Sequence, residues 1–330
     1  MLIPQDTINE IKSRIDIVDI IGDFVNLKKS GQAFKAMSPF TNEKTPSFFV
    51  VPAKGIYKCF SSGKGGDAIN FIMEYDGLSY TEALKYLAAK YGIEIVEREL
   101  TDEDLQAQNE RESLFIINNF AKDYFADQLI NSDEGKTIGL SYFHNRGLQK
   151  EDIDKFELGY SLESWDDFLK HALEKGFSKE IVEKAGMISR KDDREYDRFR
   201  GRVMFPIHNQ TGKVIAFGAR TLKKDKKVPK YLNSPETDIY YKSKVLYGLH
   251  LAKGPIRKED NCYIVEGYTD VISLHHFGIQ NVVSSSGTAL TMDQIQLLSR
   301  FSENVTVLFD GDPAGVRASL RGIDMLLEGG

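Results

Sequence analysis

Residues 262–271 read CYIVEGYTDV, and residues 305–315 read VTVLFDGDPAG. In each stretch an apolar run of strand length ends on an acidic residue, and a helix-forming segment follows it. We predict strands over residues 262–265, 281–284 and 305–309, and helices over residues 270–277, 291–301 and 313–327. Strands and helices that alternate in this way form a parallel sheet with right-handed crossovers. The last part of the chain is therefore predicted to have an α/β fold.

Four acidic residues follow the predicted strands. Glu266 and Asp310 come directly after the first and third strands, whose carboxyl ends meet at one edge of a parallel sheet. Asp312 is separated from Asp310 by one glycine, so both carboxylates can turn toward one point. Taken singly, Asp270 and Asp312 are better explained as helix caps. Carboxylates without a nearby histidine or cysteine suit Mg²⁺ or Mn²⁺, so the combination predicts a metal site.

Length and composition are those of an ordinary globular protein. The 330 residues exceed what one core usually organises, so we expect two or three domains. The chain has 41% hydrophobic residues but no apolar run long enough to span a membrane, and its acidic start is not a signal peptide. The two cysteines, Cys59 and Cys262, lie far apart, which argues against a disulfide framework and favours a reducing cytoplasm.

Basic residues are concentrated in two segments of a chain whose net charge is -6. Residues 198–230 hold ten basic residues and one acid, and residues 28–64 hold seven lysines and one acid. This distribution is typical of a protein that binds a polyanion along a defined track. Alternation on a strand would place Arg198, Arg200 and Arg202 on one exposed face that binds phosphates. The sequence KKDKK at residues 223–227 is interpreted as a solvated loop.

Several local elements can also be predicted. Residues 4–21 have the apolar spacing of one amphipathic helix, and residues 34–37, 47–51 and 56–60 form short strands. Asp67 is a plausible N-cap for a helix over residues 68–75, and a second helix runs over residues 80–91. Residues 202–207 and 213–217 form a hairpin around the turn at residues 209–212. The six histidines show no metal spacing and are interpreted as structural.

The acidic motifs VEGYTDV (residues 265–271) and DGDPAG (residues 310–315), with SGTAL (residues 286–290) between them, resemble the Toprim domain. Bacterial primases, topoisomerases, some nucleases and recombination-mediator proteins share this domain. The form VEGYTDV is similar to that of DnaG-type primases, and residues 141–148, 198–207, 217–220, 230–237 and 246–248 resemble the same family in order. The resemblance implies that Glu266, Asp310 and Asp312 are catalytic and that these three and Asp270 hold the metal. It also implies a set of contacts with template, primer or nucleotide: Arg146, Arg198, Arg200, Arg202, Arg220, Lys230, Tyr231, Asn233 and Lys242.

The first part of the chain resembles the zinc ribbon of the same family, through SPFTNEKTPSF (residues 38–48) and CFSSGKGGD (residues 59–67). The family's four ligands, three cysteines and a histidine, correspond here to Ser38, Thr41, Cys59 and Ser62. Because structural zinc needs thiolate or imidazole donors, we predict that no zinc is bound. Two roles stay open for the aromatic residues of this segment, a compact apolar core or stacking on the bases of single-stranded DNA. The aromatic residues are Phe34, Phe40, Phe48, Phe49, Tyr57 and Phe60, and the lysines that would accompany stacking are Lys35, Lys44, Lys58 and Lys64.

These observations predict an α+β multidomain protein. Residues 1–98 would form a zinc-ribbon-like template-binding domain, residues 99–112 a linker, residues 113–255 a basic subdomain of an RNA polymerase core, and residues 256–330 an incomplete Toprim domain. The family's further acidic positions would lie beyond Gly330. The expected function is that of a DNA primase, an enzyme that makes short RNA primers from NTPs on single-stranded DNA. The alternatives are another Toprim enzyme, such as a nuclease or topoisomerase, and a non-catalytic DNA-binding module.

The resemblance also implies where the protein works and with what. It implies a cytoplasmic, nucleoid-associated protein whose partners are the single-stranded template, NTPs and the RNA primer. A replicative helicase is expected through a C-terminal domain absent from this chain, and no membrane partner is expected.

Overall fold

The structure is a computed structural model that describes residues 3–95, 101–191, 194–223, 228–286 and 290–328. The chain divides into two compact units, Met1–Leu105 and Gln106–Gly330, which are described separately. The predicted linker over residues 99–112 lies partly outside the described residues, and its remainder forms the first turns of α5 (Asp102–Asn131). No helix of the described residues is long and apolar enough to cross a bilayer.

The first unit begins with two helices rather than the single helix predicted over residues 4–21. Helix α1 (Gln5–Arg14) ends before Asp16, and α2 (Ile17–Gly22) starts after it. The Asp16 carboxylate accepts hydrogen bonds from the backbone N–H groups of Val18 and Asp19, at 2.8 and 3.3 Å. The break arises because a capping acid sits inside a continuous apolar pattern.

An antiparallel sheet of five strands follows in chain order. Its strands are β1 (Lys28–Ser30), β2 (Ala33–Ala36), β3 (Phe48–Val51), β4 (Ile56–Cys59) and β5 (Gly65–Gly66), with the short helix η1 (Pro52–Lys54) between β3 and β4. Asp67 caps α3 (Ala68–Asp76) as predicted, by accepting from the Asn70 N–H at 2.9 Å. Helix α4 (Tyr80–Lys90) starts with a Ser79–Glu82 capping box.

Most aromatic residues of this unit form its core. Phe48 and Tyr57 are buried and stacked with ring centroids 5.3 Å apart, and Phe71 of α3 meets both rings edge-on. Phe34 and Phe40 are partly buried against the same cluster. Phe60 instead is 69% exposed and touches Phe49. The core interpretation is therefore right for most of these rings and wrong for Phe60.

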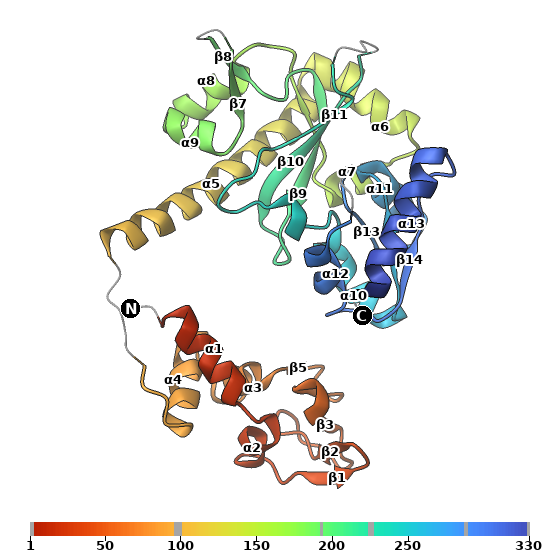
Figure 1. Cartoon of the computed structure of the whole chain (residues 1–330). Coiled ribbons are helices and arrows are strands. Elements are labelled where there is room, and N and C mark those ends of the chain that lie inside the picture. Colours follow the sequence, from red (N-terminus) through yellow and green to blue (C-terminus); the bar gives the residue numbers. More distant parts are fainter. Residues whose placement is uncertain (1–2, 96–100, 192–193, 224–227, 287–289, 329–330) are drawn as a thin grey trace. The chain divides into compact units, whose positions relative to one another are not determined.

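The second unit contains an antiparallel sheet in the order β11-β10-β9-β6. The hairpin of β9 (Arg202–His208) and β10 (Val214–Thr221) was predicted, and Asn209 shapes its turn by accepting from the N–H groups of Thr211 and Lys213. The outer strands are β6 (Gly159–Ser161) and β11 (Tyr231–Asn233). Figure 1 shows α5 running beside this sheet, and α5 residues share a buried cluster with β10.

Shorter elements connect these parts of the second unit. The π-helical segment η2 (Gly135–Leu140) and α6 (Ser141–Asn145) follow α5, and α7 (Lys150–Lys155) precedes β6. Between β6 and β9 lie α8 (Asp167–Glu174), α9 (Lys179–Lys184) and the hairpin of β7 (Ile188–Lys191) with β8 (Arg194–Asp197). The 3-10 turn η3 (Lys242–Lys244) follows β11.

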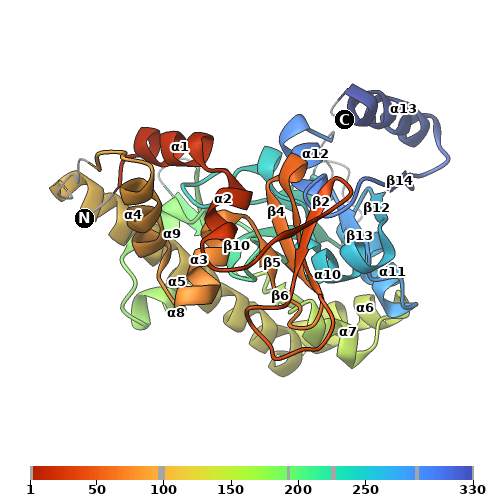
Figure 2. The ribbon, with the colours of Figure 1, turned by 90° about the horizontal axis from the view of Figure 1, so that it is seen from below.

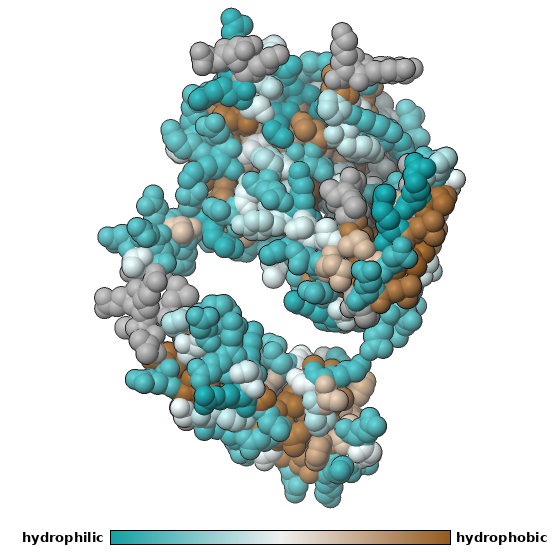
Figure 3. Space-filling model, in the orientation of Figure 1, coloured by the Kyte–Doolittle hydropathy of each residue, from teal (hydrophilic) through white to brown (hydrophobic). Residues whose placement is uncertain are grey.

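The predicted parallel sheet is present, in the order β13-β12-β14. Strand β12 (Cys262–Val265) lies between β13 (Val282–Ser284) and β14 (Val305–Val307), and both pairings are parallel. The helices are α10 (Leu249–Glu259), α11 (Tyr268–His276), α12 (Met292–Leu298) and α13 (Pro313–Glu328). Figure 2 shows the three strands next to one another beside α10 and α11. Figure 3 shows hydrophobic residues along α13, where four apolar side chains are exposed: Val316, Leu320, Ile323 and Leu327.

The two sheets of the second unit share one hydrophobic core. Tyr268 of α11 stacks on Phe205 of β9, with ring centroids 5.1 Å apart and planes 12° from parallel. The same Tyr268 ring lies against Gly218 of β10, where an added Cβ would come within 2.3 Å of Cζ. The absence of a side chain at Gly218 therefore allows the parallel sheet to dock on the antiparallel one.

Candidate active site

A cavity of about 600 Å³ opens between the acidic edge of the parallel sheet and the edge of the antiparallel sheet. It gathers eight of the predicted site residues, together with Gly267, Tyr268, Thr269 and Ser286. The eight are Arg146, Arg220, Lys230, Tyr231, Asn233, Glu266, Asp270 and Asp310. Residues far apart in sequence thus line one cavity. We call Arg146, Arg220 and Lys230 the basic wall, and Glu266, Asp270 and Asp310 the acidic wall. The SGTAL motif contributes Ser286, whereas its residues 287–289 lie outside the described part of the chain.

Three of the four acids, Glu266, Asp270 and Asp312, are held by a backbone N–H group. Glu266, directly after β12, turns toward the third strand and accepts through Oε1 from the Asp310 N–H at 3.0 Å. Asp270 accepts from the Gly267 N–H at 2.9 Å in the first turn of α11. Asp312 accepts from the Gly315 N–H at 2.8 Å at the start of α13 and does not line the cavity. Asp312 therefore takes the capping position, whereas Asp270 both caps a helix and lines the cavity.

The electrostatics of the acidic wall favour a cation. Burial raises the pKa of Asp270, and the nearby Asp310 raises it further, while the Gly267 N–H, Arg146 and Arg220 act in the opposite direction. A divalent ion among these oxygens would relieve the repulsion. Among the described residues no three His, Cys, Asp or Glu side chains form a ready cage. A few carboxylates at the rim of a cavity suit Mg²⁺, which is commonly bound by one or two carboxylates with water and substrate phosphates as its other ligands.

The basic wall is ordered by tyrosines. Arg220 Nη1 donates to the Tyr142 hydroxyl at 2.6 Å and to the Tyr231 hydroxyl at 3.2 Å. The Lys230 ammonium lies 5.8 Å from the centre of the Tyr231 ring. Tyr142 was not among the predicted site residues, because only the folded chain brings it next to Arg220.

A second hydrogen-bonded chain joins the two walls. The Tyr268 hydroxyl donates to Asn233 Oδ1 at 2.7 Å, and Asn233 Nδ2 donates to the Ser286 carbonyl at 3.2 Å. Asn233 belongs to β11 and the other two residues to the parallel-sheet region, so the chain fixes the width of the cavity.

The predicted row of three arginines is wrong. Residues 198–201 form a turn, and only Arg202 lies in a strand. The turn is possible because Gly201 adopts φ +62°. Arg202 is 5% exposed and donates to the Pro229 carbonyl at 3.0 Å, so its side chain braces the segment before β11. Arg198 donates to Ser189 Oγ at 3.3 Å.

Arg200 instead forms part of a stacked group that the sequence did not reveal. Its guanidinium lies 3.7 Å from the centre of the Trp165 ring, and Trp165 meets Tyr196 edge-on at 5.7 Å. Trp165 is 62% exposed. Lys242, also a predicted contact, lies in η3 and does not line the acidic cavity.

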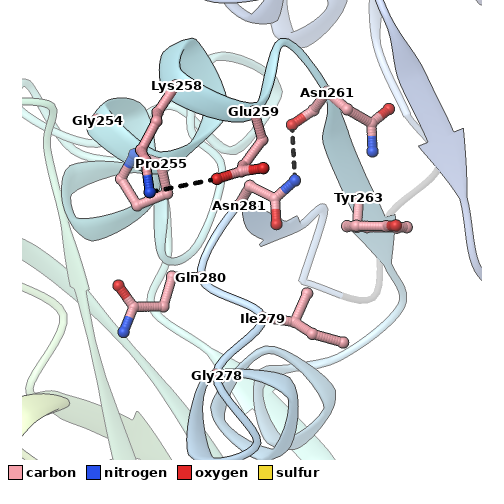
Figure 4. A pocket seen from close by; sticks show the side chains of 10 residues that line it. All are labelled: Gly254, Pro255, Lys258, Glu259, Asn261, Tyr263, Gly278, Ile279, Gln280 and Asn281. Carbon is pink, nitrogen blue, oxygen red and sulfur yellow. Dashed lines mark hydrogen bonds and ion pairs between the residues drawn. The ribbon is translucent and has the colours of Figure 1, made fainter.

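A second hollow, of about 750 Å³, lies at the opposite edge of the parallel sheet (Figure 4). Its polar groups are engaged with one another: Asn281 Nδ2 donates to the Asn261 carbonyl at 2.9 Å, and Lys258 pairs with Glu259 at 3.5 Å. Because it lies at the amino ends of the strands, it is separate from the acidic wall.

In the first unit, the positions compared with zinc ligands form a cluster of hydroxyl groups around one thiol. The Cys59 thiol donates to Ser38 Oγ at 3.1 Å and lies 3.3 Å from Ser61 Oγ. Burial alone would raise the pKa of Cys59, but hydrogen bonds with Ser38, Ser61 and Ser62 outweigh it and lower the pKa to about 6. A hydrogen bond from Ser47 is the main cause that lowers the pKa of Glu43 to about 2.

Comparison with known proteins covers nearly the whole chain. Residues 3–103 match the CHC2 zinc finger, residues 124–253 the N-terminal domain of the DNA primase catalytic core, and residues 263–330 a Toprim-like domain. A DNA primase of Clostridium acetobutylicum is 43% identical over 333 residues, which cover 100% of this chain and 54% of that protein. The chain belongs to the bacterial DnaG-type primase family. It spans about half the length of the curated relatives it matches.

Solved structures of primases are also similar to this chain. The zinc-binding and RNA polymerase domains of the Aquifex aeolicus primase are 37% identical, with a TM-score of 0.61 over 98% of this chain and 77% of that one. A DnaG primase catalytic domain bound to single-stranded DNA is 39% identical, with a TM-score of 0.61 over 67% of this chain and 68% of that one.

These comparisons correct the prediction that no zinc is bound. The first unit matches a zinc finger of the primase family, and a structure covering nearly the whole chain includes a zinc-binding domain. The prediction counted only thiolate and imidazole donors at four positions. It left out Glu43, whose carboxylate binds Ser47 next to Cys59, and carboxylate oxygen is also a zinc ligand. The number of cysteines at the aligned positions is therefore not enough to decide whether this unit binds zinc.

Proposed function

We propose that this chain carries the catalytic centre of a DNA primase, which joins NTPs into RNA primers on single-stranded DNA. The observation that carries the proposal is that Glu266, Asp270 and Asp310 line the same cavity as Arg146, Arg220 and Lys230. Phosphoryl transfer requires acidic residues that can hold a metal ion, together with basic residues that can hold phosphates. The related catalytic domain bound to single-stranded DNA supports the same class of template.

The two walls have separate tasks in this proposal. Glu266, Asp270 and Asp310, with Asp312 at the entrance to α13, would hold Mg²⁺ or Mn²⁺. The bound ion would neutralise phosphate charge and align the attacking hydroxyl. Arg146, Arg220 and Lys230 would hold the nucleotide phosphates, because they share the cavity with the acids. Tyr231 and Asn233 would position the nucleotide beside them.

The template would be bound outside this cavity. Arg198, Arg200 and Lys242 remain proposed contacts to template or primer, whereas the buried Arg202 would act by bracing the segment before β11. Arg200 with Trp165 offers a stacking surface. The segments proposed for these tasks are residues 113–255 for the nucleic-acid track and residues 256–330 for the metal. Residues 1–98 would hold the template, and residues 99–112 would join the two parts. Nucleoid association and helicase binding through a further domain belong to the same proposal.

A primer-synthesis assay with single-stranded DNA, NTPs and Mg²⁺ tests the proposal. Where this chain is part of a longer protein, that protein is assayed beside it. Primers that disappear in Asp310→Ala, while binding to single-stranded DNA persists, support the primase. Cleavage or relaxation of DNA without primer synthesis would point to another Toprim activity. DNA binding with no metal-dependent reaction would point to a binding module.

A further inference from the structure

One tyrosine lies behind the basic wall and contacts both of its arginines. The Tyr142 hydroxyl accepts from Arg220 Nη1 at 2.6 Å, and the Arg220 guanidinium lies 5.0 Å from the centre of the Tyr142 ring. The Arg146 guanidinium lies 5.6 Å from the same ring. Tyr142 itself does not line the cavity, so its role must act through the arginines.

Tyr142 is anchored from behind. It is half-buried, packs against the shared core of the second unit and meets Phe143 edge-on at 5.4 Å. Anchoring matters because arginine side chains lose much rotamer freedom when they are held in one place. An aromatic ring fixed by the core provides a surface on which guanidinium groups can rest.

Arg220 depends strongly on this support. Its Nε is buried without a hydrogen-bond partner among the described residues, so Nη1 makes the contacts that orient the group. Of its two acceptors, Tyr142 is the nearer, by 0.6 Å (2.6 against 3.2 Å). Arg146 is exposed in a turn after α6, and the Tyr142 ring is the aromatic surface it contacts.

We propose that Tyr142 is a positioning residue that aligns Arg146 and Arg220 as a pair for the phosphates of the incoming nucleotide. The inference rests on the proposed function, because it assigns the pair to the nucleotide rather than the template. The assignment follows from the cavity, which both arginines line together with Asp270 and Asp310. The phosphates of a nucleotide bound in this cavity would lie within reach of both guanidinium groups.

The test is an equilibrium titration of ATP with Mg²⁺ on the native chain, Tyr142→Phe and Tyr142→Leu. Tyr142→Phe keeps the ring but removes the acceptor, so ATP should bind about 5–10-fold more weakly. Tyr142→Leu removes ring and hydroxyl and should weaken binding further. Inorganic triphosphate, used as a competitor, should lose the same factor, because the contacts are to phosphate. Affinity for a single-stranded DNA oligonucleotide should stay within about twofold.

Tyr263→Phe is the matched control, since Tyr263 is half-buried in the same unit and lines the opposite hollow. Thermal unfolding of each variant checks that Tyr142→Leu is folded, and Tyr142→Phe keeps the test valid if it is not. Unchanged ATP affinity in Tyr142→Phe, or weakened DNA binding in place of ATP binding, would overturn the inference. So would a native chain that binds no ATP. Failure of the native protein to make primers, with these ATP effects intact, would instead count against the proposed function.

Discussion

Gly218→Ala tests whether the two sheets of the second unit dock through the missing side chain at position 218. An added Cβ would lie 2.3 Å from Tyr268 Cζ and 2.5 Å from its hydroxyl oxygen. Carbon atoms pack at about 3.5–4.0 Å, so the ring would have to retreat by more than about 1 Å. It has no room to do so, because it is fully buried between Phe205, Tyr247 and the backbone.

The expected cost can be worked out from these contacts. Overpacking of this kind costs about 1–3 kcal/mol, and loss of the 2.7 Å hydrogen bond from Tyr268 to Asn233 adds about 1 kcal/mol. For a unit of this size each kcal/mol lowers the melting temperature by about 2–4 °C, so Gly218→Ala should lower it by roughly 5–15 °C. Because Tyr268 and Asn233 line the cavity, ATP affinity should fall too.

Trp165 makes the measurement specific. It is the chain's only tryptophan and belongs to the second unit, so its emission follows the unfolding of that unit alone. Gly322→Ala in α13 is the control, since a Cβ there meets nothing within 4 Å and no proline follows it. The control should gain about 0.5–1 kcal/mol, as helical glycine replaced by alanine does. If Gly218→Ala melts like the native protein with ATP affinity intact, the docking argument is wrong.

Three further predictions concern pH, metal and DNA. Burial lowers the pKa of His250 to about 3 and of His275 to about 4, both below the ordinary value of about 6.5. The unfolded chain therefore takes up more protons, and the free energy of unfolding, measured in urea, should decrease as pH falls from about 6.5 toward 4. Asp312→Asn keeps an oxygen that can cap the helix but removes the negative charge. Mn²⁺ binding, measured by electron paramagnetic resonance, should therefore weaken while the melting temperature stays the same. Unchanged Mn²⁺ binding would show that Asp312 serves only as a helix cap. Trp165→Ala should weaken binding of single-stranded DNA by about 1–3 kcal/mol in an anisotropy titration, whereas unchanged affinity would exclude stacking on this ring.

The parallel sheet could be predicted from the sequence because its signal is local. Apolar runs ending on Glu266 and Asp310 place the strands and the acidic edge, and β12 has the predicted bounds. The helix over residues 4–21 failed for a local reason as well, since Asp16 is hidden within a continuous apolar period. The alternation at residues 198–202 suggested a strand, but Gly201 permits a turn.

The missed features depend on contacts between distant residues. Tyr142 reaches Arg220 across 78 positions, and Trp165 meets Arg200 only once β8 and the following turn are folded. The zinc prediction failed because it tested identity at four positions, whereas the family match rests on the whole ribbon. Local periodicity was therefore enough to locate the acidic residues. The residues that support the arginines could be found only in the three-dimensional structure.

The backbone anchors of the acids have a consequence for ion selectivity. Glu266 is tied to the third strand's loop through the Asp310 N–H, and Asp270 to the turn before α11 through the Gly267 N–H. Ca²⁺ takes six to eight oxygens at about 2.3–2.6 Å in loose geometry, whereas Mg²⁺ needs about 2.0–2.1 Å and strict octahedral order. A carboxylate with one oxygen hydrogen-bonded to the main chain is held at a fixed angle, so it turns less readily to offer both oxygens to a larger ion. In the proposed metal site the anchoring therefore favours the smaller Mg²⁺ over Ca²⁺.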